Sequence, residues 1–198
     1  MSRPCAYVAG ATGYVGREVV SSLRRLDLDT VAHVRPESAR AGEWRARFEA
    51  LGARIDLTPW EPAAMSATLA ALAPTHVFAL IGTTRKRARA EVVGGDPYQT
   101  IDYGLTALLL AAAREVSPPP RFIYLSSAGV GPGARSAYLK ARWRLEQELT
   151  SSGLPHVIAR PSFITGPDRD DSRPAERAAA TVADRALAVV GAFGAELR

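Results

Sequence analysis

Short apolar runs alternate with segments of helical spacing along most of this chain. The runs that favour strands are rich in β-branched and aromatic residues, and they cover residues 4–9, 30–34, 53–57, 75–81, 121–125 and 156–159. Apolar residues at helical spacing predict helices over residues 15–26, 43–51, 62–72, 97–116, 138–150 and 176–190. Strands that alternate with helices in this way predict an α/β protein, with a doubly wound parallel sheet and helices on both of its faces.

A glycine turn joins the first predicted strand to the first predicted helix. It reads Gly10-Ala11-Thr12-Gly13-Tyr14-Val15-Gly16. In a dinucleotide-binding βαβ unit, such glycines make a tight turn, let the backbone approach a pyrophosphate and let the helix pack on the strand. The helix N-terminus then offers N–H groups to the phosphates. Glycine turns without a ligand also occur, but strand, turn and helix together favour a single Rossmann-type domain over residues 1–198. The expected cofactor contacts in this turn are Gly10, Thr12, Gly13, Tyr14, Val15 and Gly16.

The second predicted strand leads into Arg35. In a Rossmann unit this strand end faces the adenosine ribose, where an acidic residue binds the 2′-hydroxyl and an arginine accommodates a 2′-phosphate. No acidic residue follows Arg35 before Glu37. The sequence therefore predicts NADP as the cofactor in preference to NAD, with Arg40 as a second candidate for the phosphate. The alternative is that Arg35 is a surface charge after a strand.

The composition is that of an ordinary soluble domain. The chain has 198 residues, of which 47% are hydrophobic and 23% charged, and its net charge is +5. A single cysteine, Cys5, excludes an intramolecular disulfide framework. The N-terminus does not resemble a signal peptide and the apolar stretches are too short for a bilayer, so we expect a cytoplasmic protein without a membrane partner. The basic run at residues 85–89 lacks an aromatic platform, so we expect no nucleic-acid partner.

Several motifs carry a resemblance to a known family. The glycine turn resembles the GATGxxG motif of the extended and atypical short-chain dehydrogenase/reductases, which include NAD-dependent epimerase/dehydratase-like proteins. Residues 80–85 and 173–176 resemble the Tat-interacting oxidoreductase-like branch of the atypical group. The resemblance implies cofactor contacts beyond the glycine turn: Asp56 and Leu57 at the adenine, Leu80, Gly82, Thr83 and Ser126 at strand ends, Tyr138, and Pro161 and Phe163 near the nicotinamide carboxamide.

The resemblance also implies a catalytic group after the fifth strand. Short-chain dehydrogenases use a serine, a tyrosine and a lysine four residues after the tyrosine. Ser127 and Tyr138 match the first two, and the tyrosine would be the general acid or base towards a substrate carbonyl or hydroxyl. Arg142 stands in the place of the lysine, on the same helical face as Tyr138, whereas Lys140 faces largely the opposite way. Arginine keeps a positive charge near the phenol, but it is bulkier and planar and never gives up its proton.

Two functions follow from these residues. The first is an NADP(H)-dependent oxidoreductase of the atypical short-chain type that acts on a small carbonyl or alcohol, with residues 161–198 as a substrate-side appendage. The second, which Arg142 favours, is a non-catalytic NADP(H)-binding protein that senses redox state or holds a partner. The three histidines are scattered through the chain, so we expect no metal site. A homodimer is compatible with either function.

Overall fold

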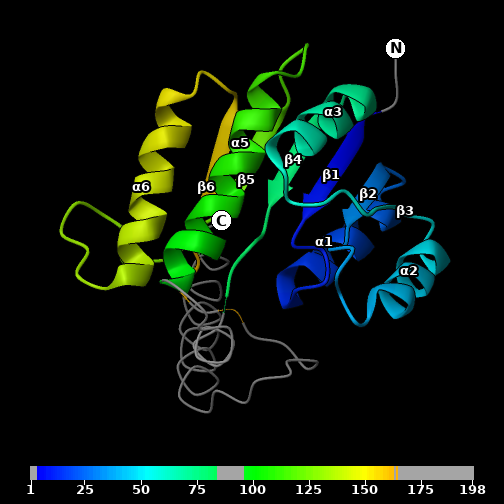
Figure 1. Cartoon of the computed structure of the whole chain (residues 1–198), viewed down its shortest axis with the longest axis horizontal. Helices are drawn as coiled ribbons and strands as arrows, with labels where there is room; N and C mark the ends of the chain where they lie inside the picture. Colours follow the sequence, from blue (N-terminus) through cyan, green and yellow to red (C-terminus); the bar gives the residue numbers. More distant parts are fainter. Residues whose placement is uncertain (1–3, 84–95, 163, 165–198) are drawn as a thin grey trace, which may run out of the picture. The chain divides into compact units, whose positions relative to one another are not determined.

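The computed structural model describes residues 4–83, 96–162 and 164. Contacts divide the chain into two units, Met1–Arg160 and Pro161–Arg198, and the fold described here is that of the first unit (Figure 1). Its strands are β1 (Cys5–Ala9), β2 (Asp29–His33), β3 (Arg54–Asp56), β4 (His76–Ala79), β5 (Arg121–Leu125) and β6 (His156–Ala159). Its helices are α1 (Tyr14–Arg25), α2 (Ala41–Ala50), α3 (Pro62–Leu72), η1 (Tyr98–Leu105), α5 (Thr106–Arg114) and α6 (Ala137–Ser151).

The strands form one parallel sheet in the order β3-β2-β1-β4-β5-β6. Figure 1 shows β1 and β4 side by side in the middle of the sheet. The strand order reverses between these two, and open α/β sheets bind ligands at such a point, outside the carboxyl ends of the strands. The prediction of a Rossmann-type doubly wound sheet with flanking helices is therefore confirmed.

Strand β1 is buried along its whole length because its successive side chains enter two different cores. Tyr7 and Ala9 belong to a core that includes residues of α3, α5 and α6. Ala6 and Val8 belong to a second core with residues of α1 and α2. Helices therefore cover both faces of the sheet, as a parallel sheet requires.

The helix predicted over residues 97–116 is not a single α-helix. It begins as the π-helix η1 and continues as α5. π-Helices are rare and are frequently found at functional sites. Here η1 carries Asp102, whose buried carboxylate binds Thr83 after β4 and Arg142 on α6. The apolar periodicity of the sequence contains no trace of this long-range contact, so it predicts an ordinary helix.

The other predicted elements of the first unit end within two residues of the observed ends. The helix predicted over residues 176–190 lies outside the described residues. In the part of the chain that the structure describes, no helix is long and apolar enough to cross a bilayer.

Candidate functional site

Two glycines of the turn at residues 10–16 are demanded by the fold itself. Gly10 has a φ of +80°, and a Cβ there would lie 2.6 Å from the carbonyl oxygen of Leu80 after β4. A Cβ at Gly16 would lie 2.1 Å from the carbonyl oxygen of Gly10. Neither distance leaves room for a side chain, so Gly10 makes the tight turn and Gly16 lets α1 pack on it.

The fold itself does not require a glycine at position 13 in the same way. Its Cβ would meet only the carbonyl oxygen of Gly10, at 3.2 Å, and its φ is an ordinary −72°. Gly13 is the N-cap of α1, where no side chain caps the helix and no acidic residue stands in the first turn. Such a helix end has a partial positive charge and N–H groups that suit a phosphate. The space that a Cβ at Gly13 would fill lies at the N-terminus of α1, and it suits a dinucleotide pyrophosphate.

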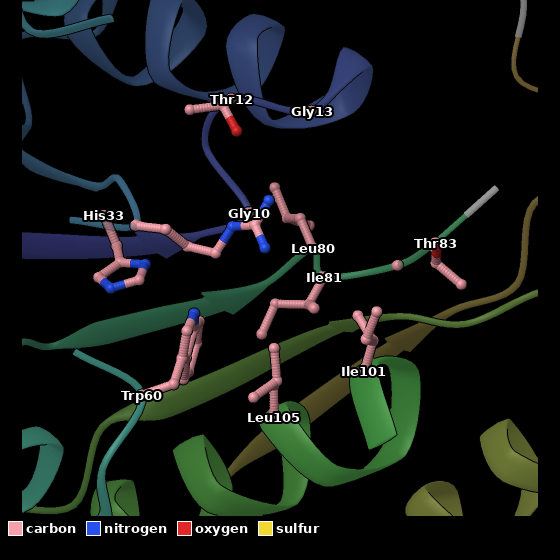
Figure 2. A pocket seen from close by; sticks show the side chains of 12 residues that line it. Gly10, Thr12, Gly13, His33, Trp60, Leu80, Ile81, Thr83, Ile101 and Leu105 are labelled. Carbon is pink, nitrogen blue, oxygen red and sulfur yellow. The ribbon is translucent and has the colours of Figure 1, made fainter. Parts of the chain in front are cut away.

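A pocket lies beside this turn, at the carboxyl ends of β1, β2 and β4 (Figure 2). It is lined by Gly10, Thr12, Gly13, His33, Arg35, Trp60, Leu80, Ile81, Gly82, Thr83, Ile101 and Leu105. The structure thus brings the predicted glycine turn, Arg35 and the predicted residues after β4 to one place. Sequence reasoning misses His33, Trp60, Ile81, Ile101 and Leu105. His33 and Ile81 lie at the ends of predicted strands, which is a usable signal, whereas Trp60 and the two η1 residues reach the pocket only through the tertiary fold.

The two arginine candidates for a 2′-phosphate differ in their surroundings. Arg35 is exposed and lines the pocket. Arg40 is engaged elsewhere: its Nε and Nη2 donate to the Glu43 carboxylate at 2.7 and 2.6 Å, and its guanidinium stacks on Trp44 at 4.9 Å. Of the two, Arg35 is therefore the better placed to meet a ligand.

Asp56, a predicted adenine contact, uses both carboxylate oxygens within the protein. The Tyr7 hydroxyl donates to Oδ2 at 2.7 Å, and the Thr58 backbone N–H and hydroxyl donate to Oδ1 at 3.1 and 2.6 Å. Burial, with the neighbouring Asp56 carboxylate, raises the pKa of the Tyr7 phenol. Neither Asp56 nor Leu57 is among the residues that line the pocket, and their contact with adenine stays a prediction.

Tyr138 and Arg142 lie against one another on α6. The guanidinium carbon of Arg142 is 4.6 Å from the centroid of the Tyr138 ring, whereas Lys140 is exposed. The spacing of four residues therefore brings the cation to the phenol, as predicted. The rings of Tyr138 and Tyr98 of η1 also meet edge to face, with centroids 5.5 Å apart. Arg142 itself is only 6% exposed.

Arg142 is held by an ion pair that spans the carboxyl edge of the sheet. Its Nη2 lies 3.1 Å from Oδ1 of Asp102, its Nη1 donates to the Leu125 carbonyl oxygen at the end of β5, and the other Asp102 oxygen accepts the Thr83 backbone N–H at 3.0 Å. A Cβ at Gly82 would lie 3.1 Å from Nη2 of Arg142. The glycine after β4 therefore leaves room for this ion pair, which is a structural reason for a residue predicted to contact the cofactor.

Burial dominates the electrostatics of this pair. It raises the pKa of the Asp102 carboxyl from 3.8 to about 6, although the Arg142 charge and the Thr83 N–H both act to lower that pKa. Asp102 is thus ionised at neutral pH but close to its titration range. The Nε of Arg142 is buried and has no hydrogen-bond acceptor among the described residues.

The two serines after β5 have different environments. The hydroxyl of Ser126, 3% exposed, donates to the Glu146 carboxylate at 2.5 Å, and Glu146 also pairs with Arg160 after β6. Ser126 therefore holds α6 to the sheet, and its contact with the cofactor stays a prediction. Ser127 is half-buried and donates only a long bond, 3.3 Å, to the carbonyl oxygen of Ala128. Its hydroxyl is the more available to a ligand.

Two further predicted cofactor contacts lie beyond the first unit. Phe163 lies outside the described residues, and Pro161 belongs to the second unit. Within residues 4–83, 96–162 and 164, no group of His, Cys, Asp and Glu side chains could hold a metal ion.

Residues 10–192 match the model of a protein family described as NAD(P)H-binding. The chain belongs to the NAD(P)H-binding family. Among its relatives is the protein fmp52-1, mitochondrial, of Aspergillus terreus, which is 30% identical over 181 residues, or 88% of this chain and 72% of that protein.

Solved structures share the fold. A candidate NAD-dependent epimerase/dehydratase from Bacillus halodurans is 26% identical with a TM-score of 0.66, over 84% of this chain and 74% of that one. Leucoanthocyanidin reductase of Vitis vinifera, solved with NADPH, is 20% identical with a TM-score of 0.62, over 80% of this chain and 50% of that one. This chain thus spans between half and three quarters of these structures. The dinucleotide named differs between these two proteins, so the likeness shows the shared fold and no preference between NAD and NADP.

The comparison corrects the predicted cytoplasmic location, which is wrong. The relatives from Aspergillus species are named mitochondrial, which points to mitochondria instead of the cytoplasm. The length of apolar runs and the lack of a secretory signal pattern bear on membrane spans and secretion. They do not distinguish between these two compartments.

Proposed function

We propose that this NAD(P)H-binding protein is an NADP(H)-dependent oxidoreductase of the atypical short-chain dehydrogenase/reductase type, in the Tat-interacting oxidoreductase-like branch, acting on a small carbonyl or alcohol. One observation carries the proposal: the Tyr138 ring lies 4.6 Å from the guanidinium carbon of Arg142. That guanidinium is fixed to the carboxyl end of β5 by the Leu125 carbonyl oxygen. A phenol beside a fixed cation, at the edge of the sheet where the dinucleotide turn lies, is suited to proton transfer.

The chemistry divides between cofactor and chain. When bound, NADPH would supply the hydride that reduces a carbonyl carbon. Tyr138 would donate its phenolic proton to the carbonyl oxygen, which becomes the hydroxyl of the product. Arg142 would stabilise the phenolate that remains on Tyr138, because arginine keeps its charge throughout. The half-buried Ser127 hydroxyl would orient the same oxygen by a hydrogen bond.

Arg35 supports NADP as the preferred cofactor. Its side chain is exposed and lines the pocket beside the glycine turn. A guanidinium there can form charge-assisted hydrogen bonds with a 2′-phosphate, which NAD lacks. Arg40 would contribute less, because Glu43 already holds it.

A second function is favoured by the way Arg142 is bound. The lysine of the resembled family would be available to a cofactor, whereas the Arg142 guanidinium is committed to Asp102 and to the Leu125 carbonyl. This fits a chain that binds NADP(H) without turnover, as a redox sensor or to hold a partner. In that case Tyr138 and Arg142 only pack α6 against η1 and β5.

The test is a titration with NADPH and NADH, followed by a panel of carbonyl compounds with NADPH consumption as the readout. We expect wild type to bind NADPH and to reduce at least one member of the panel. Tyr138→Phe should remove turnover and leave the affinity for NADPH unchanged. Tyr103→Phe is the matched control, because the Tyr103 hydroxyl bonds to Glu148, and it should retain activity.

The outcomes separate the two functions. Binding of NADPH without consumption over the whole panel would favour the non-catalytic protein. Full turnover in Tyr138→Phe would refute the mechanism and leave cofactor binding intact. Failure to bind either dinucleotide would refute both functions.

A further inference from the structure

Two aromatic side chains line one end of the pocket. His33 is the last residue of β2, and Trp60 lies between β3 and α3. Their rings meet edge to face, with centroids 4.7 Å apart and planes at 68°. Figure 2 shows the two rings next to one another, below the glycine turn. The two rings carry nitrogen atoms that can form hydrogen bonds with a ligand: Nδ1 or Nε2 of His33, and Nε1 of Trp60.

His33 has one fixed tautomer. Its Nε2 lies 2.8 Å from the Thr58 carbonyl oxygen, and a carbonyl can only accept, so Nε2 carries the hydrogen. The side chain is 3% exposed, and burial lowers its pKa, so the ring is neutral at pH 7. Nδ1 is therefore a lone-pair acceptor. Among the described residues no protein group donates to it, and Figure 2 shows a ring nitrogen on the side of His33 that faces the pocket.

Trp60 offers the opposite polarity. An indole Nε1–H can only donate, and Figure 2 shows this nitrogen at the end of the ring nearest the pocket interior. In the described part of the chain it has no hydrogen-bond acceptor. Four apolar residues line the same pocket: Leu80, Ile81, Ile101 and Leu105. This end of the pocket therefore presents one acceptor, on His33, and one donor, on Trp60, within an apolar surface, which suits a flat heterocycle.

We propose that His33 and Trp60 read the adenine base: the 6-amino group donates to His33 Nδ1, and a neighbouring ring nitrogen accepts from Trp60 Nε1–H. This rests on the proposed function, because it takes NADP(H) as the ligand. On the edge of adenine that carries the 6-amino group, this donor lies next to a ring nitrogen that accepts. This arrangement complements the acceptor of His33 and the donor of Trp60. The Asp56 carboxylate is less suited to this role, because Tyr7 and Thr58 already donate to its two oxygens and it does not line the pocket.

The pair disfavours a base whose 6-position is an oxygen. Hypoxanthine and guanine place an acceptor where adenine has its amino group, so two lone pairs would face each other at His33 Nδ1. A buried acceptor left without a donor loses binding free energy. His33 and Trp60 are thus residues that determine base specificity, in addition to the glycine turn that holds the phosphates.

The experiment compares NADPH with its deamino analogue, in which hypoxanthine replaces adenine, by calorimetric titration of the full chain. Wild type should bind the analogue more weakly by on the order of tenfold. His33→Phe should bind NADPH more weakly and lose this discrimination. Trp60→Phe should lose part of it. His156→Phe is the matched control, since His156 bonds to the Leu154 carbonyl at another strand end, and it should discriminate like wild type.

Equal affinity of wild type for the two dinucleotides would overturn the proposal, and that comparison needs no variant to fold. Discrimination that persists in both His33→Phe and Trp60→Phe would also overturn it, because other groups would then read the base. If neither dinucleotide binds to wild type, the proposed function itself fails. Loss of discrimination with NADPH binding retained separates base reading from cofactor binding.

Discussion

The two halves of the carboxyl edge are built in different ways. The half at β1 and β2 uses glycines in the turn, the N-terminus of α1 and the ring of His33, together with the exposed cation of Arg35. The half at β5 and α6 contains two buried carboxylates, Asp102 and Glu146, each paired with an arginine. The first half leaves room for a ligand that brings its own negative charge, whereas the second balances its charges internally before any ligand arrives.

This difference matters because buried charges are costly to separate. Asp102 and Arg142 have side chains 1% and 7% exposed, whereas the partners of the Arg25–Glu18 pair are 64% and 71% exposed. Removal of one partner of a buried pair leaves an uncompensated charge, while a surface pair contributes little. Substitutions in the half at β5 and α6 should therefore affect mainly stability, and substitutions in the half at β1 and β2 should affect mainly ligand binding.

The largest effect is expected from Asp102→Leu, because the buried Arg142 guanidinium and the Thr83 backbone N–H would both lose their hydrogen-bond acceptor, which even a protonated Asp102 still provides. We expect a loss of about 3–5 kcal/mol in the free energy of unfolding, measured by urea denaturation. Glu18→Ala, which breaks an exposed pair, should change the free energy of unfolding very little. The double variant Asp102→Leu/Arg142→Met should recover most of the loss. Equal losses in Asp102→Leu and Glu18→Ala would contradict the buried pair.

The next effect is a dependence of stability on pH. The pKa of Asp102 is raised from 3.8 to about 6, so between these values the native state holds a proton that the unfolded state has released. The Asp102 contribution to stability is therefore full below about pH 4 and is lost as the pH rises through 6, by about 3 kcal/mol. The free energy of unfolding of wild type minus that of Asp102→Asn should fall over this range. A difference that rises with pH would mean that Arg142 outweighs burial.

The glycine turn gives an intermediate effect and separates folding from binding. Gly16→Ala should lower stability by about 1–3 kcal/mol, because its Cβ would lie 2.1 Å from the Gly10 carbonyl oxygen and force a shift of the backbone. Gly13→Ala, with its single contact at 3.2 Å, should change stability by less than about 1 kcal/mol and weaken NADPH binding. Thermal unfolding and cofactor titration of both variants check this. Normal NADPH affinity in Gly13→Ala would place the pyrophosphate elsewhere.

The smallest effect concerns the choice of cofactor. Arg35→Asp should weaken NADPH binding by about tenfold, or about 1.4 kcal/mol, and favour NADH instead. The effect is small because an exposed guanidinium contributes less binding free energy than a buried one. Arg40→Ala, which removes a residue already paired with Glu43, should change the ratio of the two affinities less. Parallel titrations with NADPH and NADH decide this. Equal affinities of wild type for NADPH and NADH would show that Arg35 does not select between the two cofactors.

Sequence reasoning recovers the parts of this molecule that local chemistry determines. The alternation of apolar runs and helical segments predicts the strands and helices of the first unit, and the glycine turn predicts the switch point where the pocket lies. Gly10 and Gly16 can be predicted from the sequence, because the steric clash that each glycine avoids is with its own turn or with the strand end beside it. The spacing of Tyr138 and Arg142 is equally local, since four residues is one helical turn.

The tertiary structure decides what the sequence leaves open. Asp102 and Arg142 are 40 residues apart, and nothing in either segment indicates that the arginine is bound to a carboxylate instead of lying free for a cofactor. The π-helical register of η1 and the meeting of His33 with Trp60 likewise depend on groups from distant elements. Local patterns record the conformation of a segment, but the partner of a buried charge or a ring nitrogen is set by which elements the sheet brings together.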